Sequence, residues 1–402
     1  MKPPGTTIGL GKRLLFVLIL AFIGLLLFEV VARLTFPEFN LNNNWQYHPV
    51  LGWSQIPGGK YDYELEGRTV HVEFNSLGFR DVAHEIEKPP GVKRIVIIGD
   101  SYCESVQVNL EETFFKRLEK QLNERGGPKW EVINLGIGDH GNAQAWIALT
   151  EYGLRYSPDF VIHQIFPLND ICNNTVELAG LCKSRNDRYR PYFVERGGEL
   201  VLTSAEPVRN FLRRHVVSYG VLERSYFRFA GDPVPIDNEG VDRLLRELGF
   251  PPLGPLLYTY VDDREQMEPT KRGWRVTERI LRKIADTCKD HGVALLPVVV
   301  PFVAMVKPES RESFMSGLPP PKIDPDYPDR RLAHLFARLG VPHVLLKPVF
   351  KAHPENLYLA DGHLNTEGHS VMAQALYDKM MEAGLMRKSS NRPEWTPKRR
   401  DQ

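Results

Sequence analysis

Four separated stretches of the chain carry side chains that could together perform acyl-transfer chemistry. Ser101 follows the apolar run RIVIIGD, and Asn169 lies in PLND, directly after a second apolar run. Asp361 and His363 stand together in the late segment YLADGHLN. A serine hydroxyl attacks a carbonyl carbon when a base removes its proton, and a carboxylate holds the imidazole base in the correct tautomer. Ser101, His363 and Asp361 can fill these three roles.

The same chemistry needs hydrogen-bond donors for the oxyanion of a tetrahedral intermediate. The stretch NLGIGDHGN supplies the backbone amides of Gly138 and Asp139, and the Ser101 amide and the Asn169 side chain are further donors. Each motif alone is weak, because serine turns, Asn-Asp pairs and histidines near aspartates are common in loops. Their order along the chain, each beyond an apolar run, favours one shared site.

Five apolar runs that end in turn signals alternate with amphipathic segments after residue 90. The runs are RIVIIG at 94–99, WEVINLG at 130–136, DFVIHQIF at 159–166, VALLPVVV at 293–300 and PHVLLKP at 342–348. Helical periodicity marks the segments 111–125, 142–156, 270–291, 328–339 and 367–384. Strands too apolar to face water, separated by helices, predict an α/β fold with a doubly wound, parallel five-stranded sheet and helices on both faces. The four motifs fall at carboxyl ends of the predicted strands, where such sheets bind ligands.

The amino-terminal region has the composition of a membrane segment. Residues 14–36 number 23 and include fifteen consecutive uncharged residues, LLFVLILAFIGLLLF. Such a segment is long enough to cross a hydrocarbon core of ~30 Å. Lys12 and Arg13 precede it, which predicts a cytoplasmic segment 1–13 and an exported, periplasmic or otherwise extracytoplasmic, remainder. A cleaved signal peptide is the alternative, but no clear small-residue cleavage site follows the apolar run.

Three further regions flank or interrupt the predicted sheet domain at 91–388. Residues 37–90 are aromatic and turn-rich and predict a small β element that leads into the domain. Residues 171–269 form a long insert after the third strand, with a hairpin signal at a Gly-Gly pair. Inserts at this position commonly form a lid or a wall of the substrate site. Residues 389–402 are basic and predict a disordered tail.

Side chains of the insert allow more than one interpretation. Tyr189, Tyr192 and Phe193 either pack the predicted hairpin or form a platform for a sugar ring or an acyl chain. Cys172 and Cys182 are ten positions apart and could pair in an oxidising compartment.

Composition and spacing disfavour several other classes of protein. A formal net charge of +1 gives no reason to expect nucleic acid as a partner. His363 and His369 lie near Asp361, but no second cluster completes a zinc-type ligand set. The sequence therefore predicts no metal site, and His369 is expected at the start of the final helix.

Cys103 and Cys288 fall in apolar or helical settings and are expected to be free and buried.

The four motifs together resemble the sequence blocks of the SGNH/GDSL hydrolase family. GDSY resembles the nucleophile block, NLGIGDHGNAQ the glycine block, PLND the asparagine block and DGHLN the Asp/His block, over about residues 45–385. NSLGFRD is similar to a lead-in found in membrane-anchored bacterial members, often in envelope or exopolysaccharide loci. The resemblance implies a flavodoxin-like sheet and acyl-ester chemistry with no metal and no organic cofactor. The residues that match the family's site are Ser101, His363 and Asp361 for the triad and Ser101, Gly138, Asp139 and Asn169 for the oxyanion.

Two departures from the family pattern leave alternatives open. The usual oxyanion glycine aligns with Asp139, so the inward-facing amide could belong to Gly138 or to Asp139. The acid and the base are spaced D-x-H rather than D-x-x-H, a spacing similar to that of alginate O-acetyltransferase-like proteins and also to that of anchored GDSL-type proteins. The sequence therefore predicts an ester hydrolase for an acylated small molecule or polysaccharide of the cell envelope. The alternatives are an O-acyltransferase that modifies a polysaccharide and a non-catalytic protein of envelope assembly or glycan binding.

Overall fold

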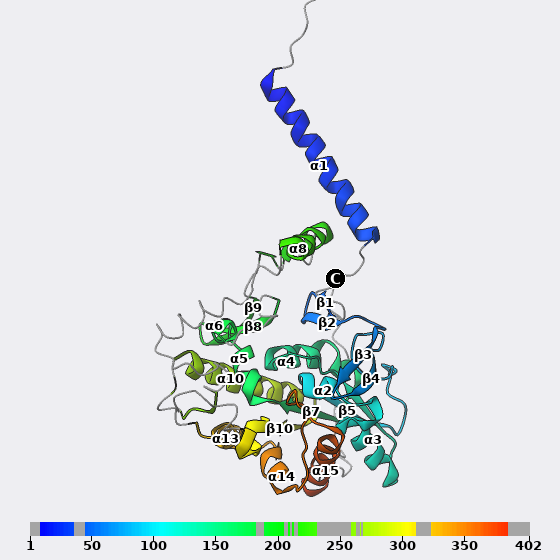
Figure 1. The fold of residues 1–402 in the computed structure, drawn as a ribbon, viewed down its shortest axis with the longest axis vertical. Coiled ribbons are helices and arrows are strands. Elements are labelled where there is room, and N and C mark those ends of the chain that lie inside the picture. Colours follow the sequence, from blue (N-terminus) through cyan, green and yellow to red (C-terminus); the bar gives the residue numbers. More distant parts are fainter. Residues whose placement is uncertain are drawn as a thin grey trace, which may run out of the picture.

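A five-stranded parallel sheet forms the centre of the protein in the computed structural model (Figure 1). The structure describes residues 9–35, 45–181, 189–204, 208–209, 211–212, 216–230, 259–262, 266, 268–310 and 323–384. The strand order is β11-β10-β7-β5-β6. These strands are β5 (Lys93–Ile98), β6 (Trp130–Asn134), β7 (Phe160–Ile165), β10 (Ala294–Val299) and β11 (Val344–Leu345). Counted along the chain this is the 2-1-3-4-5 order of flavodoxin-like sheets, which confirms the predicted doubly wound α/β fold.

Helices cover both faces of the sheet (Figure 1). They are α3 (Phe114–Glu124), α4 (Asn142–Glu151), α10 (Glu268–Asp290), α13 (Tyr327–Leu339) and α15 (Thr366–Glu382). Ile95 and Ile97 of β5 share an apolar cluster with residues of α3, α13 and α15. Val96 and Ile98 share a second cluster with α4 and α10, because successive strand side chains point to opposite faces. Burial on both faces explains the continuous apolar runs of the sequence.

The predicted length of the fifth strand is wrong. Only Val344–Leu345 pairs with β10, and the chain turns directly into α14 (Leu346–Ala352). Pro348 stands in the first turn of that helix, where a missing N–H breaks no helical hydrogen bond. Two further short helices replace predicted turns, α2 (Ser101–Glu104) after β5 and α5 (Pro167–Asn173) after β7. Helices of this length are too short to show helical periodicity in a sequence.

The region before the sheet folds as the expected small β element. It contains two antiparallel hairpins, β1 (Trp45–His48) with β2 (Gly52–Gln55) and β3 (Lys60–Leu65) with β4 (Arg68–Glu73). Trp53 is fully buried in the same apolar cluster as two residues of β5. The lead-in therefore shares a core with the central sheet.

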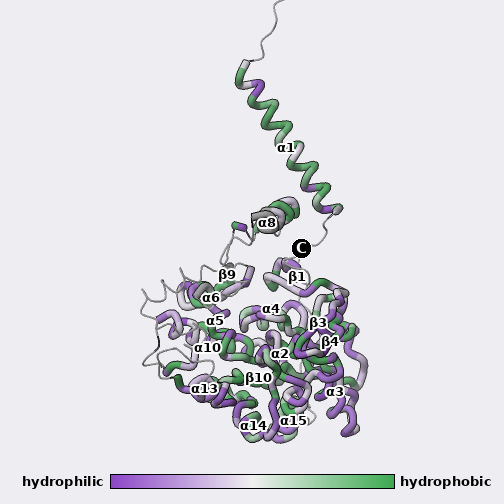
Figure 2. Tube along the Cα trace, in the orientation of Figure 1, coloured by the Kyte–Doolittle hydropathy of each residue, from purple (hydrophilic) through white to green (hydrophobic). Residues whose placement is uncertain are grey.

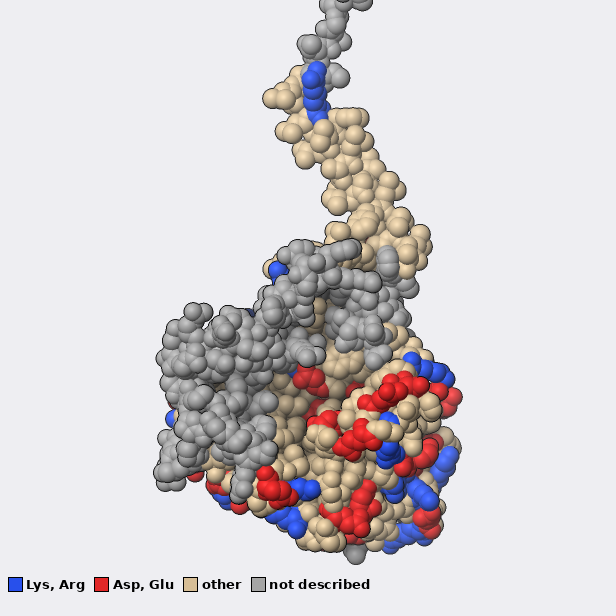
Figure 3. Space-filling view, in the orientation of Figure 1, with Lys and Arg blue, Asp and Glu red and all other residues tan. Residues whose placement is uncertain are grey.

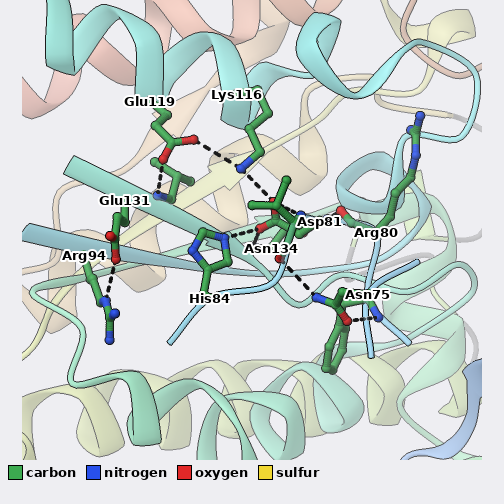
Figure 4. Close-up of polar contacts among 12 residues, drawn as sticks. Asn75, Arg80, Asp81, His84, Arg94, Lys116, Glu119, Glu131 and Asn134 are labelled. Atoms are coloured by element: carbon green, nitrogen blue, oxygen red, sulfur yellow. Dashed lines mark hydrogen bonds and ion pairs between the residues drawn. The ribbon is translucent and has the colours of Figure 1, made fainter. Parts of the chain in front are cut away.

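The motif NSLGFRD joins the lead-in to the sheet through a buried polar network (Figure 4). Asp81 forms a 2.7 Å ion pair with Lys116 of α3 and accepts the Asn134 N–H of β6 at 2.9 Å. The buried Arg80 guanidinium donates to backbone carbonyls of the loop after α2, including that of Val108 at 2.5 Å. Buried charges need such partners, so the motif clamps the lead-in and the loop after α2 together.

Helix α1 (Leu10–Thr35) extends away from the rest of the protein (Figure 1). Its residues are hydrophobic over most of its length (Figure 2), and Figure 3 shows basic side chains near its amino-terminal end. It is long and apolar enough to cross a membrane, and none of its most apolar window is buried in the protein. Signal sequences share this length and composition, so the helix supports a membrane segment without fixing its retention or orientation.

The described part of the insert contains the predicted hairpin. Strand β8 (Pro191–Arg196) pairs antiparallel with β9 (Glu199–Ser204). Gly197 and Gly198 connect them, and both have positive φ, as a two-residue type I′ turn requires. A helix, α6 (Val176–Leu181), precedes the hairpin.

The aromatic residues of this hairpin pack inside the protein. Tyr192 and Phe193 are 0 % and 2 % exposed, so the interpretation of these two as a substrate platform is wrong. Tyr189 is half-buried, with its ring centroid 6.2 Å from that of Tyr47. Residues 231–258, which belong to the expected lid, and the expected tail at 389–402 lie outside the described residues.

Candidate active site

Ser101, His363 and Asp361 lie in one continuous hydrogen-bonded chain. His363 Nε2 lies 2.8 Å from Ser101 Oγ, and His363 Nδ1 lies 3.0 Å from Asp361 Oδ2. The serine opens α2, whereas the other two residues stand in the loop before α15, so the fold joins positions far apart in the sequence. The His363 and Asp361 side chains are 25 % and 23 % exposed, and Ser101 is half-buried. Solvent can therefore reach a hydroxyl that faces an imidazole, which is in turn bonded to a carboxylate, an arrangement suited to nucleophilic chemistry.

Asp361 is held by two donors that the sequence did not single out. Its Oδ2 accepts Gln107 Nε2 at 3.1 Å and the Tyr63 hydroxyl at 3.2 Å. Its Oδ1 accepts the His363 backbone N–H at 3.0 Å. Burial alone would raise the pKa of Asp361, but the hydrogen bonds and charge of His363, together with Gln107, lower that pKa to about 2. The carboxylate is therefore ionised at neutral pH.

At the end of β5, just before Ser101, the side chains of Gln164 and Cys103 pack closely against Gly99. A Cβ on Gly99 would lie 2.4 Å from Gln164 Oε1, the same atom that accepts the Asp100 N–H at 2.9 Å. The Asp100 carboxylate accepts the Tyr102 N–H at 3.0 Å and so caps α2. Burial raises the pKa of Asp100 to about 6. The apolar strand, the glycine, the acid and the hydroxyl therefore form one strand-to-helix turn.

The glycine-rich block after β6 passes close to α2. A Cβ on Gly136 would lie 2.1 Å from Cys103 Cβ, so this approach requires glycine. The Gly138 N–H is hydrogen-bonded to the buried Glu104 carboxylate. Asp139 has φ 62°, in the left-handed region that glycine adopts freely and that aspartate tolerates better than most residues. A glycine at the aligned position of the family pattern would meet the same backbone requirement.

A residue of the insert holds Asp139 in this conformation. Arg190 Nη2 lies 3.2 Å from Asp139 Oδ2, and Arg190 Nη1 donates to the Asp139 carbonyl at 2.7 Å. The Arg190 side chain is 0 % exposed and lies over the Trp53 ring, with its guanidinium carbon 4.8 Å from the centroid. Paired, hydrogen-bonded guanidinium groups are costly to displace from a buried position. Arg190 carried no signal in the sequence.

Asn169 approaches the serine turn from the neighbouring strand. It lies in the first turn of α5, and its Nδ2 donates to Asp100 Oδ2 at 3.3 Å. Asn169 Oδ1 is buried and has no hydrogen-bond partner among the described residues. Burial and the charge of Asp100 raise the pKa of the adjacent Asp170 well above its usual range. The strand order reverses between β5 and β7, so Ser101 and Asn169 lie at the switch point where such sheets bind ligands.

His369 lies outside this constellation, in the first turns of α15 as expected. Its Nδ1 accepts the Phe114 N–H at 3.2 Å, and burial lowers the pKa of His369 to about 3. Within the described ranges, no group of three or more His, Cys, Asp or Glu side chains is placed to hold a metal ion.

The cysteines agree with the expectation where the structure describes them. Cys103 and Cys288 are free and buried. Cys172 is disulfide-bonded. Cys182, the residue with which the sequence suggested that it could pair, lies outside the described residues.

Comparisons with known proteins give likenesses among solved structures alone. No family model matches the chain, and no curated protein matches it. A lipase/acylhydrolase from Enterococcus faecalis is 12% identical with a TM-score of 0.37, covering 72% of this chain and 96% of its own. A GDSL-like lipase from Bacteroides thetaiotaomicron is 14% identical with a TM-score of 0.31, covering 72% and 89%. A two-domain esterase active on acetylated mannans is 12% identical with a TM-score of 0.35, covering 75% and 52%. Likenesses this distant establish no activity or substrate, which depend on the residues of the chain itself.

Proposed function

We propose that this protein is a serine-dependent ester hydrolase that acts through Ser101, His363 and Asp361. The observation that carries the proposal is the chain of 2.8 Å and 3.0 Å contacts from the serine hydroxyl through the imidazole to the carboxylate. A purely structural histidine of this protein, such as His369, is buried and bonded to backbone. His363 instead is partly exposed and faces a hydroxyl at the ligand-binding edge of the sheet.

The reaction begins when Ser101 Oγ bonds to the ester carbonyl carbon and its proton moves to His363 Nε2. The carbonyl π electrons move to oxygen, and the ionised Asp361 stabilises the imidazolium. Collapse of the tetrahedral intermediate breaks the bond to the alcohol oxygen, which takes the proton from His363. Water then attacks the acyl-serine with His363 again as the base, and the free acid and Ser101 are released.

The oxyanion is stabilised by the backbone amides of Ser101 and Asp139 and by the Asn169 side chain. We assign the loop amide to Asp139 because the Gly138 N–H is hydrogen-bonded to Glu104. Asn169 Nδ2 carries two hydrogens, so the bond to the carboxylate that caps α2 can orient the amide while the second hydrogen points to the oxyanion. The reaction requires no metal and no organic cofactor.

The substrate is proposed to be an acylated small molecule or a polysaccharide of the cell envelope. The support is α1, which as an uncleaved anchor over residues 14–36 would hold the domain at the membrane surface. Lys12 and Arg13 favour a cytoplasmic amino terminus and a periplasmic or other extracytoplasmic site. A reporter fused after Gln402 should be active only outside the cytoplasm. Activity of a cytoplasm-only reporter at that position would reverse the orientation.

The first alternative is O-acylation of a polysaccharide hydroxyl, which the D-x-H spacing of Asp361 and His363 supports. Hydrolysis and transfer share the acyl-serine and differ in whether water or a sugar hydroxyl resolves it. Adding a sugar alcohol at high concentration to an ester assay separates them. Acyl-sugar formed at the expense of free acid means transfer, and unchanged free acid means hydrolysis.

Fluorophosphonate labelling of the full chain tests the proposed nucleophile. The probe should modify Ser101, and Ser101→Ala should abolish both labelling and p-nitrophenyl acetate cleavage. Ser370→Ala, a matched change in α15 away from the site, should retain both. A folded protein that is neither labelled nor active would favour the second alternative, a non-catalytic role in assembly or glycan binding.

A further inference from the structure

Helix α8 (Val217–Ala230) lies beside the carboxyl-terminal end of α1 (Figure 1). The Glu29 carboxylate accepts the Val217 N–H at 3.0 Å and the Ser218 N–H at 2.8 Å. Glu29 also forms a 2.7 Å ion pair with Arg33. The first N–H groups of a helix have no partner within the helix, so Glu29 satisfies two of them. The contact ties the apolar helix to the insert.

The position of Glu29 along α1 sets the depth of α8 in a membrane. Fifteen uncharged residues, 14–28, precede Glu29 and extend over ~22 Å at 1.5 Å per residue. If a core of ~30 Å begins at Leu14, Glu29 lies ~8 Å below the outer edge of the hydrocarbon, within the depth of ~5–10 Å to which interfacial helices insert their apolar faces. A helix hydrogen-bonded to Glu29 lies at that level as well.

Large apolar side chains are exposed on α8 and on the residues before it. Val208, Phe211 and Leu222 are 71%, 61% and 55% exposed. Arg209 stands between the first two in the sequence. Exposed apolar side chains next to basic residues are typical of helices that lie in a membrane interface.

We propose that α8 and the described residues 208–209 and 211–212 before it form a second membrane contact. Their occupant is the bilayer surface, with apolar side chains inserted below the headgroups and Arg209 at the level of the phosphates. The proposal rests on α1 remaining in the membrane. Its consequence is that the active-site domain is attached at two points, through α1 and through the insert.

Quenching by brominated lipid tests this contact in the full chain reconstituted into phosphatidylcholine/phosphatidylglycerol vesicles. A single fluorophore is attached at Leu222→Cys or Phe211→Cys. Val349→Cys in α14, 37% exposed and at the opposite end of the protein from α1 in Figure 1, is the control. The native free thiols are buried, so labelling should be confined to the introduced cysteine.

Lipid quenching is expected at both insert positions and absent at the control. Glu29→Ala should reduce it at Leu222, because α8 then loses its partner in α1. No quenching at Leu222 and Phe211 overturns the proposal. If shielding of the Leu222 label depends on protein concentration and not on lipid, the surface binds a second copy of the chain and the proposal is wrong. If the protein is lost from the vesicles, the proposed membrane anchor is refuted as well.

A second observation concerns the hairpin β3–β4, which packs against the loop that carries Asp361 and His363. The Tyr63 hydroxyl donates to Asp361 Oδ2 at 3.2 Å, and the Glu66 carboxylate accepts the Ala360 N–H at 2.6 Å. At the far end of the loop, Arg68 donates to Thr366 Oγ1 at 3.2 Å. A hairpin of the lead-in thus contacts both ends of the catalytic loop.

We infer that Tyr63 and Gln107 are positioning residues that act through Asp361. Both donate to Oδ2, the oxygen that faces His363 Nδ1, and so they fix the carboxylate against rotation. Hydrogen bonds to a charged group are stronger than neutral ones, so loss of one should be measurable in the rate. The inference deepens the proposed triad and rests on it.

Tyr63→Phe removes this hydroxyl with little change of shape, and Tyr61→Phe is its matched control on the same strand face. Tyr63→Phe should lower kcat and the fluorophosphonate labelling rate roughly tenfold, with KM and the urea midpoint unchanged. Gln107→Leu should have a similar effect, and the double variant a larger one. Equal rates for Tyr63→Phe and Tyr61→Phe would overturn the inference, whereas absence of labelling in the unmodified protein would instead refute the proposed function.

Discussion

Replacing Asp361 by asparagine keeps the shape of the side chain and removes its charge. Asp361 Oδ2 receives three donors, His363 Nδ1, Gln107 Nε2 and the Tyr63 hydroxyl. If the asparagine NH₂ occupies the position of Oδ2, His363 must present Nδ1 as a hydrogen-bond acceptor. Its proton then sits on Nε2, which can no longer take the proton of Ser101.

The other orientation of the amide carries a different penalty. Its oxygen can then keep the contact with His363 Nδ1, but its NH₂ faces the His363 backbone N–H that Asp361 Oδ1 now accepts. Two donors oppose each other, and no negative charge stabilises the imidazolium. The same change in a Ser-His-Asp triad costs roughly 10⁴-fold in kcat, which is about 5 kcal/mol of activation free energy.

The chain offers a matched control for this experiment. Asp62 and His71 form an exposed pair on the hairpin β3–β4, with Nδ1 and Oδ1 2.5 Å apart. Asp62→Asn therefore makes the same chemical change in an Asp–His pair outside the site. Ester turnover, the rate of fluorophosphonate labelling and the urea midpoint should be measured for both variants. Asp361→Asn with more than a tenth of the original kcat, or an equal loss in Asp62→Asn, would refute the assignment of Asp361 as the triad acid.

Three further outcomes are expected. Asn169→Ala should lower kcat roughly 10²–10³-fold with the fold intact, and a loss below tenfold in the same ester assay would remove Asn169 from the oxyanion site. Lys116→Met leaves the Asp81 carboxylate buried without its cation, so urea unfolding should show a loss of roughly 3 kcal/mol, and a loss below 1 kcal/mol would contradict the role of this pair. Burial lowers the pKa of His369 to about 3, so below about pH 6.5 the unfolded chain binds a proton at His369 and the folded chain does not. The free energy of unfolding should therefore fall as the pH falls from about 6.5 towards 3. Between pH 7.5 and 5.0 the loss in the unfolding free energy should be roughly 2 kcal/mol smaller in His369→Gln, and an identical slope would show that His369 is accessible to protons in the fold.

Local patterns in the sequence were enough to determine the class of fold and the order of the chemical motifs. Apolar runs of four to eight residues can be buried only between two layers of helices, so the runs beginning at 94, 130, 159 and 293 were identifiable as central strands. The candidate site residues Ser101, Asn169, Asp361 and His363 could be grouped because parallel strands bring their carboxyl ends to one edge. The apolar segment at 14–36 could also be recognised from the sequence, because the length of an uninterrupted apolar stretch is read directly from consecutive residues.

The supporting contacts could not be predicted because each joins residues that are distant in sequence and ordinary in type. Tyr63 and Gln107 meet Asp361 across 298 and 254 positions, and neither carries a local pattern that distinguishes it from a surface tyrosine or glutamine. Arg190 likewise becomes informative only when its guanidinium is found buried against Asp139. The hydrogen bond between the Gly138 N–H and Glu104, which favours Asp139 over Gly138 as the oxyanion donor, likewise joins two segments that lie far apart in the sequence. Sequence periodicity specifies which face of an element is buried, whereas the pairing of particular polar groups depends on how complete elements pack, and that is fixed only in the tertiary structure.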